Sequence, residues 1–140
     1  MVFGRRTQSS KYGNKKVEYD GLKFDSQKEM KRYILLNEAE GKGLISDLKT
    51  QVKFELIPSI KETYTKHLKT KDKECKRTIQ LPITYTCDFQ YIKDDKVVVE
   101  DVKASPKTAS LDKAFLIKEK LFRWKFGFSI KRVYKPNDEI

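Results

Sequence analysis

The chain has 140 residues, the size of one ordinary domain, and 38% of them are hydrophobic, which is enough to build a core. Its 31 Lys and Arg against 20 Asp and Glu give a formal net charge of +11, which favours a polyanionic partner, either nucleic acid or an anionic membrane surface. No apolar run approaches the roughly 20 residues that cross a bilayer, and the N-terminus lacks the apolar segment of a signal peptide. We therefore expect a cytoplasmic protein that binds nucleic acid rather than membrane.

The first part of the chain predicts three features in order. Residues 1–15 are polar and basic without periodicity, which indicates a flexible basic arm before a single domain at 16–135. Residues 16–24 alternate around Asp20-Gly21, a dipeptide suited to a tight hairpin turn. A helix should follow, capped by Ser26 and ending near Gly41, because its apolar residues fall mostly on one face.

The middle of the chain predicts strands separated by one long excursion. Residues 51–58 alternate apolar and polar side chains up to Pro58, which is typical of a strand. Residues 61–77 hold seven Lys or Arg against three acids and few apolar side chains, so we expect a long loop, either solvated or in contact with DNA. The runs 78–92 and 96–104 are both strand-like and are joined by Lys93-Asp94-Asp95-Lys96, which predicts a hairpin.

The C-terminal part predicts a second helix and a last strand. Ser110 can cap this helix and Gly127 can end it, with Leu111, Phe115 and Phe122 on its inward side. Residues 128–134 are strand-like, and 136–140 form a tail. The order of hairpin, helix, three strands, helix and strand indicates an α/β or α+β fold with a central mixed sheet flanked by helices.

The predicted hairpin brings charged side chains together. If its connection is symmetric, Asp88 lies opposite Asp101, and the alternation of a strand places Lys103 on the same face and Glu100 on the other. Facing carboxylates need a compensating cation. Lys103 could supply it within a structural ion network, with Glu100 as a separate salt-bridge partner. Alternatively, the two carboxylates could bind Mg²⁺, which prefers oxygen ligands.

A strand with Asp, followed by a strand with an acid, any residue and Lys, resembles the signature of the PD-(D/E)XK nuclease superfamily. Here it reads Cys87-Asp88 and Asp101-Val102-Lys103, with cysteine in place of the signature's proline. The resemblance implies a restriction-endonuclease-like sandwich and a metal-dependent endonuclease. It implies that Asp88 and Asp101 hold Mg²⁺, for which Mn²⁺ can substitute, and that Lys103 orients the attacking water. Superfamily members commonly add a helical acid, a position that Glu29 matches.

The wider arrangement from about residue 12 to residue 127 is similar to a family of small phage and prophage proteins placed in this superfamily. It includes YDGLKFDSQKEMKRY, YTCDFQYI and VVVEDVKAS, with Ala104 where the family often has glycine. The similarity implies cleavage of DNA to leave a 5′-phosphate, in the host cytoplasm if the protein is phage-encoded. Branched DNA such as a Holliday junction fits this context, and two cuts in one junction would suit a homodimer.

Three of the candidate residues have two interpretations each. Glu29 could complete a capping box with Ser26 instead of binding metal. Lys118 lies on the apolar side of the second helix, where it either snorkels or contacts a substrate phosphate. Lys107 could bind a neighbouring phosphate or lie in a linker, and Gln51 is a candidate contact beside the site. For the whole chain, the alternative function is a non-catalytic nucleic-acid-binding protein that retains the nuclease fold.

Overall fold

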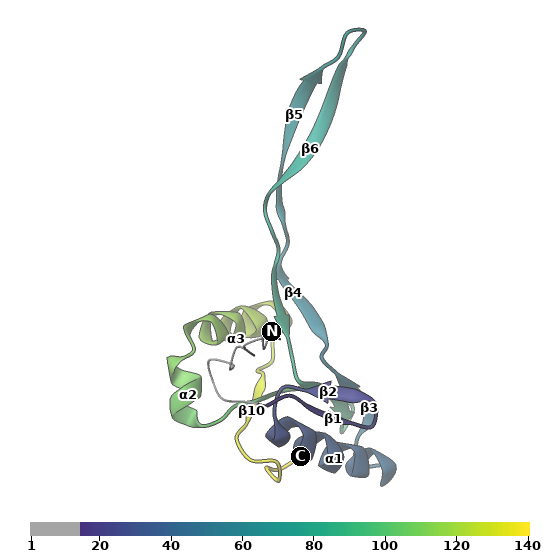
Figure 1. The fold of residues 1–140 in the computed structure, drawn as a ribbon, viewed down its shortest axis with the longest axis vertical. Helices are drawn as coiled ribbons and strands as arrows, with labels where there is room; N and C mark the ends of the chain where they lie inside the picture. Colours follow the sequence, from purple (N-terminus) through teal and green to yellow (C-terminus); the bar gives the residue numbers. More distant parts are fainter. Residues whose placement is uncertain (1–14) are drawn as a thin grey trace, which may run out of the picture.

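The computed structural model describes residues 15–140, so the basic arm expected at 1–15 lies outside the described residues except for Lys15. The described part is a mixed α+β fold with three helices and ten strands (Figure 1). In chain order the elements are β1 (Val17–Tyr19), β2 (Leu22–Phe24), α1 (Gln27–Gly41), β3 (Ser46–Thr50), β4 (Lys53–Ile57), β5 (Ile60–His67), β6 (Asp72–Gln80), β7 (Ile83–Thr86), β8 (Phe89–Lys93), β9 (Lys96–Val102), α2 (Pro106–Leu111), α3 (Lys113–Phe126) and β10 (Lys131–Val133).

The central sheet has four strands in the order β10-β9-β8-β3, with β10 parallel to β9 and the other neighbours antiparallel. The predicted hairpin is confirmed as β8–β9, and its register pairs Ile92 with Val97. Asp94 and Asp95 form its turn with φ angles of 50° and 62°, which aspartate tolerates better than most residues. This turn therefore fixes which face of the sheet each side chain of β9 occupies.

Helices cover both faces of this sheet. One core cluster joins Tyr33 and Leu36 of α1 to Phe89 and Tyr91 of β8, with Val98 packed against it. The other joins Phe115 and Phe122 of α3 to Val99 of β9, and includes Leu56 and Tyr85 from β4 and β7. Because successive residues of a strand point to opposite faces, the split between Val98 and Val99 places α1 and α3 on opposite sides.

The hairpin predicted at 16–24 and the helix predicted after it are confirmed. β1 and β2 pair around Asp20-Gly21, and α1 begins after Ser26, whose Oγ accepts a hydrogen bond from the Glu29 amide at 3.2 Å. The helix ends at Gly41 as expected. Among the described helices, none has the length and apolar character to span a membrane.

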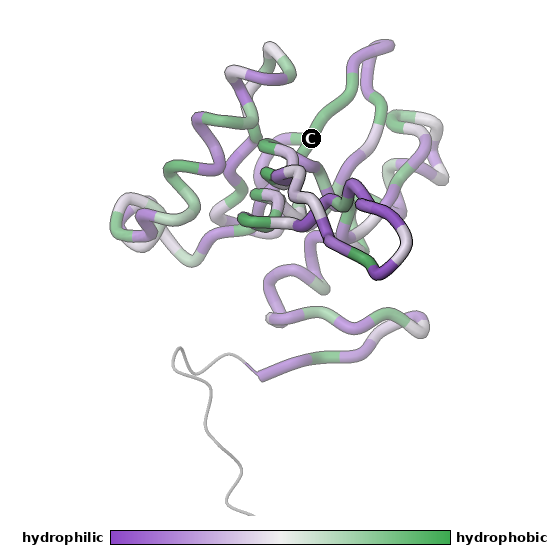
Figure 2. The backbone as a smooth tube through the Cα atoms, turned by 90° about the horizontal axis from the view of Figure 1, so that it is seen from above, coloured by the Kyte–Doolittle hydropathy of each residue, from purple (hydrophilic) through white to green (hydrophobic). Residues whose placement is uncertain are grey.

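The prediction of a loop at 61–77 is wrong, because these residues form most of the β5–β6 hairpin. Its strands pair from Ile60 with Gln80 to His67 with Asp72 and project from the body (Figure 1). Seen from above, the projecting segment is largely hydrophilic (Figure 2). Cross-strand hydrogen bonds satisfy the backbone here without any apolar core, which is why the low hydrophobic content did not prevent strand formation.

Four other features differ from the sequence prediction. The second helix is divided into α2, capped by Ser105, and α3, capped by Asp112, so Ser110 is not the cap and Leu111 is 69% exposed rather than inward. The run 78–92 is divided among β6, β7 and β8 instead of forming one strand, and β3 was not predicted. Residues 136–140, the expected tail, return to the body and contact Arg32.

Candidate functional site

Asp101 lies near the end of β9 and is held by two side chains. It is 7% exposed, and the Tyr85 hydroxyl donates a hydrogen bond of 2.6 Å to its Oδ2. Lys103 Nζ lies 3.2 Å from its Oδ1, as the alternation of the strand predicted. Both oxygens of Asp101 therefore have a partner within the chain.

Asp88 lies at the break between β7 and β8, one residue beyond the last pair of the β8–β9 ladder, Phe89 with Glu100. Its amide donates to the Glu100 carbonyl at 3.1 Å, and its Oδ2 accepts from the Val102 amide at 2.7 Å. The predicted pairing of Asp88 with Asp101 is therefore not formed as a ladder pair, because Asp88 and Phe89 both lie opposite Glu100. The bond from Val102 nevertheless fixes one carboxylate oxygen of Asp88 beside β9. Burial first, then the charges of Glu29 and Asp101, raise the pKa of Asp88 to about 8.

Glu29 brings a third carboxylate from the first turn of α1. It is 8% exposed, and its Oε2 accepts from the Asp25 amide at 3.4 Å rather than from the Ser26 amide of the predicted capping box. Burial first, then the charge of Asp25 and further that of Asp101, raise the pKa of Glu29 to about 7. The Glu29 carboxylate thus accepts a hydrogen bond at the start of α1 and also lies near enough to Asp101 to interact with its charge.

The ammonium group of Lys103 is fixed in position by α3 as well as by Asp101. It lies 3.6 Å from the centroid of the Phe115 ring and 3.8 Å from Asp112 Oδ2. An ammonium over an aromatic face is stabilised by the ring quadrupole. Lys28 of α1 also donates to the carbonyls of Lys103 and Ala104, at 3.4 and 3.0 Å. Both helices therefore hold the segment that follows β9.

A hollow of about 330 Å³ opens beside this cluster. Its lining includes Asp101, Lys103 and Lys118, with Tyr85 and Phe115 behind them. Lys118 is half-buried at its edge, on the side that the helical pattern predicted. The hollow thus combines two carboxylates, those of Asp101 and Asp112, with two ammonium groups, a set that can bind a phosphate together with a cation.

Four of the seven candidate residues lie outside this lining, namely Glu29 and Asp88, described above, and Gln51 and Lys107. Gln51 is exposed at the bend between β3 and β4, with φ at 53°, and its amide donates to the Asp88 carbonyl at 3.1 Å. Its backbone supports Asp88, while its side chain is not among the contacts of the site. Lys107 lies exposed on α2 rather than in a linker.

The carboxylates of Glu29 and Asp88 suit a hard cation by chemistry, since burial and neighbouring carboxylates raise their pKa values and added positive charge would stabilise their ionised forms. Within residues 15–140, however, no three acidic, histidine or cysteine side chains already converge as a metal cage. One or two carboxylates with water and a phosphate oxygen complete the coordination of many Mg²⁺ sites. The arrangement fits that kind of site.

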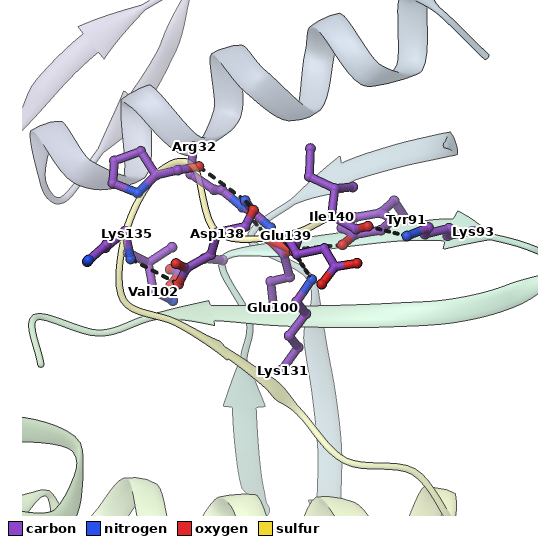
Figure 3. Close-up of polar contacts among 12 residues, drawn as sticks. Arg32, Tyr91, Lys93, Glu100, Val102, Lys131, Lys135, Asp138, Glu139 and Ile140 are labelled. Carbon is purple, nitrogen blue, oxygen red and sulfur yellow. Dashed lines mark hydrogen bonds and ion pairs between the residues drawn. The ribbon is translucent and has the colours of Figure 1, made fainter. Parts of the chain in front are cut away.

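Glu100 is separated from the cluster, as predicted for the opposite face of β9. Arg32 of α1 binds it through two hydrogen bonds of 2.8 and 2.6 Å, and both side chains are 0% exposed. Tyr91 donates a third bond to the same carboxylate at 2.8 Å (Figure 3). Arg32 also donates to backbone carbonyls of residues 136–139 (Figure 3). This satisfied pair is structural.

Sequence reasoning missed Tyr85 and Lys28. Tyr85 occupies an inward position of a strand, so its pattern indicated only packing, and its ring does pack against Phe115 and Phe122. The one signal that could have found it is the cost of burying a tyrosine hydroxyl without an acceptor. Lys28 adjoins Glu29 in the sequence, but its partners are 75 and 76 residues away.

Comparison with known proteins gives one family. The model of a family described as "Protein of unknown function (DUF1064)" matches residues 9–135. No curated protein matches the chain. No solved structure matches it either.

Proposed function

The chain belongs to the DUF1064 family, and we propose that it is a metal-dependent endonuclease that hydrolyses phosphodiester bonds of DNA. The observation that carries the proposal is that three segments bearing Glu29, Asp88, and Asp101 with Lys103 lie side by side at one end of the central sheet. Their carboxylates are near enough for the charge of Asp101 to raise the pKa values of Glu29 and Asp88. The net charge of +11 supports a polyanionic substrate.

In this proposal Asp88 and Asp101 hold Mg²⁺, or Mn²⁺ in its place, with Glu29 as the third carboxylate. The Asp88 oxygen that does not bind Val102 is the one available to a cation. Bound there, the metal would supply Lewis-acid polarisation of the phosphate and neutralise its developing charge.

The remaining roles belong to the side chains of the chain itself. Lys103 Nζ, fixed over Phe115 and beside Asp101, donates to a phosphate oxygen on which negative charge develops in the transition state. Tyr85 Oη holds the orientation of the Asp101 carboxylate. Water adds to phosphorus as the bond to the 3′ oxygen breaks, and that oxygen leaves with a proton, so the other product carries a 5′-phosphate.

The finer parts of the sequence interpretation remain within this proposal. They are membership of the PD-(D/E)XK superfamily, a restriction-endonuclease-like sandwich, a phage context with branched DNA as substrate, a homodimer and a cytoplasmic location. The layering supports the fold proposal, because helices cover both faces of a mixed sheet and the acids lie at one end of it. Lys118 and Lys107 would contact phosphates on either side of the cleaved bond.

The test is incubation of purified protein with linear and four-way-junction DNA, with Mg²⁺ or EDTA. We expect cleavage only with Mg²⁺, and a loss of at least about a hundredfold in Asp101→Asn. Asp95→Asn is the matched control, because it removes the same charge from an exposed turn and asparagine tolerates the positive φ there. Equal cleavage by Asp101→Asn contradicts the proposal. Tight DNA binding by a wild type that never cleaves favours the non-catalytic alternative.

A further inference from the structure

The β5–β6 hairpin has no packing partner that accounts for its length. Among the described elements, its two strands pack substantially only on each other (Figure 1). A two-stranded ribbon alone is marginally stable in water. Its side chains are therefore almost all available to a partner, and their arrangement on the ribbon indicates which kind.

The register divides the ribbon into two chemically different faces, since directly paired residues point the same way. One face, which we name the threonine face, carries Lys61 and Lys76 against Glu74 and Asp72, with threonines between them. Its net charge is zero with histidine neutral. The other, which we name the tyrosine face, contains the pairs Glu62 with Arg77, Tyr64 with Cys75, and Lys66 with Lys73.

The far end of the tyrosine face is an uncompensated basic cluster. Lys66 and Lys73 are direct cross-strand partners, an arrangement of like charges that destabilises a sheet. Lys69 and Lys71 follow at the tip, between the two strands. Among the ion pairs of residues 15–140, none includes any of these four lysines. The acids of the hairpin lie on the other face or bind Arg77.

Nearer the body, the same face carries side chains that attract one another. The Arg77 guanidinium lies 5.3 Å from the centroid of the Tyr64 ring and forms an ion pair with Glu62. This cluster fixes the twist and register of the ribbon below the four lysines. The basic end is thus displayed by a structured stem.

We infer that the tyrosine face and tip of the hairpin bind the phosphate backbone of duplex DNA at a distance from the hollow beside Asp101. The proposed function enters only in the choice of DNA as the partner. Eight residues of β5 at about 3.4 Å each extend roughly 27 Å, the length of about eight base pairs. A ribbon of two strands also has the width that a major groove admits. The hairpin would hold the arm of a duplex whose other part lies at the acids.

A second copy of the chain fits the lysine cluster less well than DNA, because both copies carry the same positive charge. The most exposed apolar residues of this region lie nearer the root of the hairpin, where Leu81 is 81% exposed and Ile79 is 54% exposed, while Leu68 at the tip is 40% exposed. Self-association would therefore use the root and leave the lysines free. This difference makes the two occupants separable by experiment.

The test compares two double variants that each remove two charges. Lys66→Gln with Lys73→Gln alters the tyrosine face, and Lys61→Gln with Lys76→Gln alters the threonine face of the same ribbon. Binding to a labelled duplex of about 30 base pairs, several times the span of the hairpin, is measured by fluorescence anisotropy in EDTA over a range of salt. The first variant should bind roughly tenfold more weakly or worse, with the salt slope reduced by about 2.

The threonine-face variant should retain affinity within about threefold, because its charges are screened from the bound strand. Equal losses in both variants, or no loss in either, overturn the inference. Concentration-dependent sedimentation of the wild type, together with unchanged DNA affinity in the tyrosine-face variant, also overturns it in favour of a second copy. The assay needs no cleavage, so a wild type that fails to cut DNA refutes the nuclease proposal while leaving this measurement valid.

Discussion

Glu100 and Asp101 are neighbours on β9, but their carboxylates lie in two different environments on opposite faces of the sheet. Glu100 is fully buried and receives three hydrogen bonds from Arg32 and Tyr91. Asp101 has one ammonium and one hydroxyl partner, and two further carboxylates add negative charge beside it. The chain supplies the whole counter-charge on one face and only part of it on the other. We therefore treat the first as structure and the second as a site for an added cation.

The largest expected effect comes from removing the buried ion pair between Arg32 and Glu100. Arg32→Met leaves the Glu100 charge buried without its partner and should reduce the free energy of unfolding by about 3–5 kcal/mol. Denaturant unfolding measures it. Lys131→Met is the control, because Lys131 lies 3.9 Å from the same carboxylate and is partly exposed, so its loss should stay within about 1 kcal/mol. Similar losses in the two variants would show that Glu100 does not depend on Arg32.

The next effect concerns the carboxylates near Asp101 and the dependence of protein stability on pH. In EDTA, Glu29 and Asp88 have folded-state pKa values of about 7 and about 8, above their ordinary values. The folded state thus keeps protons that the unfolded state releases, so the stability from these two groups is complete below about pH 4 and is lost as pH rises to about 8. Thermal midpoints in EDTA should show this decline.

Asp88→Asn sharpens this measurement, because asparagine retains an oxygen for the Val102 amide but has no charge. At pH 8 in EDTA, the free energy of unfolding of the variant should exceed that of wild type by about 1–2 kcal/mol. It should also lose the rise in midpoint that Mg²⁺ gives wild type, a rise that should be larger at pH 8 than at pH 6 because cation and protons compete. A Mg²⁺ response that is equal in wild type and variant would exclude Asp88 as a ligand.

A smaller effect separates the two tyrosines that serve the two faces. Tyr85→Phe removes the hydroxyl that holds Asp101, and we expect DNA cleavage to slow about tenfold, a cost near that of one hydrogen bond to a charged group. Tyr91→Phe removes the matching bond to Glu100 and should cost about 1 kcal/mol of stability without slowing cleavage by the folded protein. Single-turnover rates and unfolding curves test both. Equal slowing of cleavage in the two variants would contradict the assignment of Tyr85 to the site and of Tyr91 to the structural ion pair.

The smallest effect is expected at the edge of the hollow. Lys118→Gln should raise KM for DNA about threefold to tenfold with little change in kcat, because it removes one phosphate contact. Lys120→Gln removes a charge from an exposed position of the same helix outside that lining, and its KM should change less. A larger effect at Lys120 would place the substrate on a different side of α3.

The sequence predicted the neighbours of Asp101 on its own strand better than the side chains that reach the site from other elements. Alternation and a symmetric turn were enough to place Asp101 with Lys103 and to separate Glu100, because both are local properties of β8–β9. Tyr85 and Lys28 could not be assigned in this way, since their contacts depend on how distant elements pack. The β5–β6 hairpin was missed for the opposite reason. Its strands are held by local pairing, while the prediction asked for an apolar core that the hairpin does not use.

The start of α1 bears on how the site moves. Glu29 and Lys28 both lie in the first turn of α1. Glu29 contributes a carboxylate, and Lys28 donates hydrogen bonds to the two carbonyls that follow β9. Helix ends fray more readily than helix centres, and here the Ser26 cap opposes that opening with bonds to the amides of Glu29 and Met30. Unwinding of a single turn would release two supports of the site at once while the buried core stayed intact. The rate at which those two amides exchange their hydrogens therefore reports how often the site loosens.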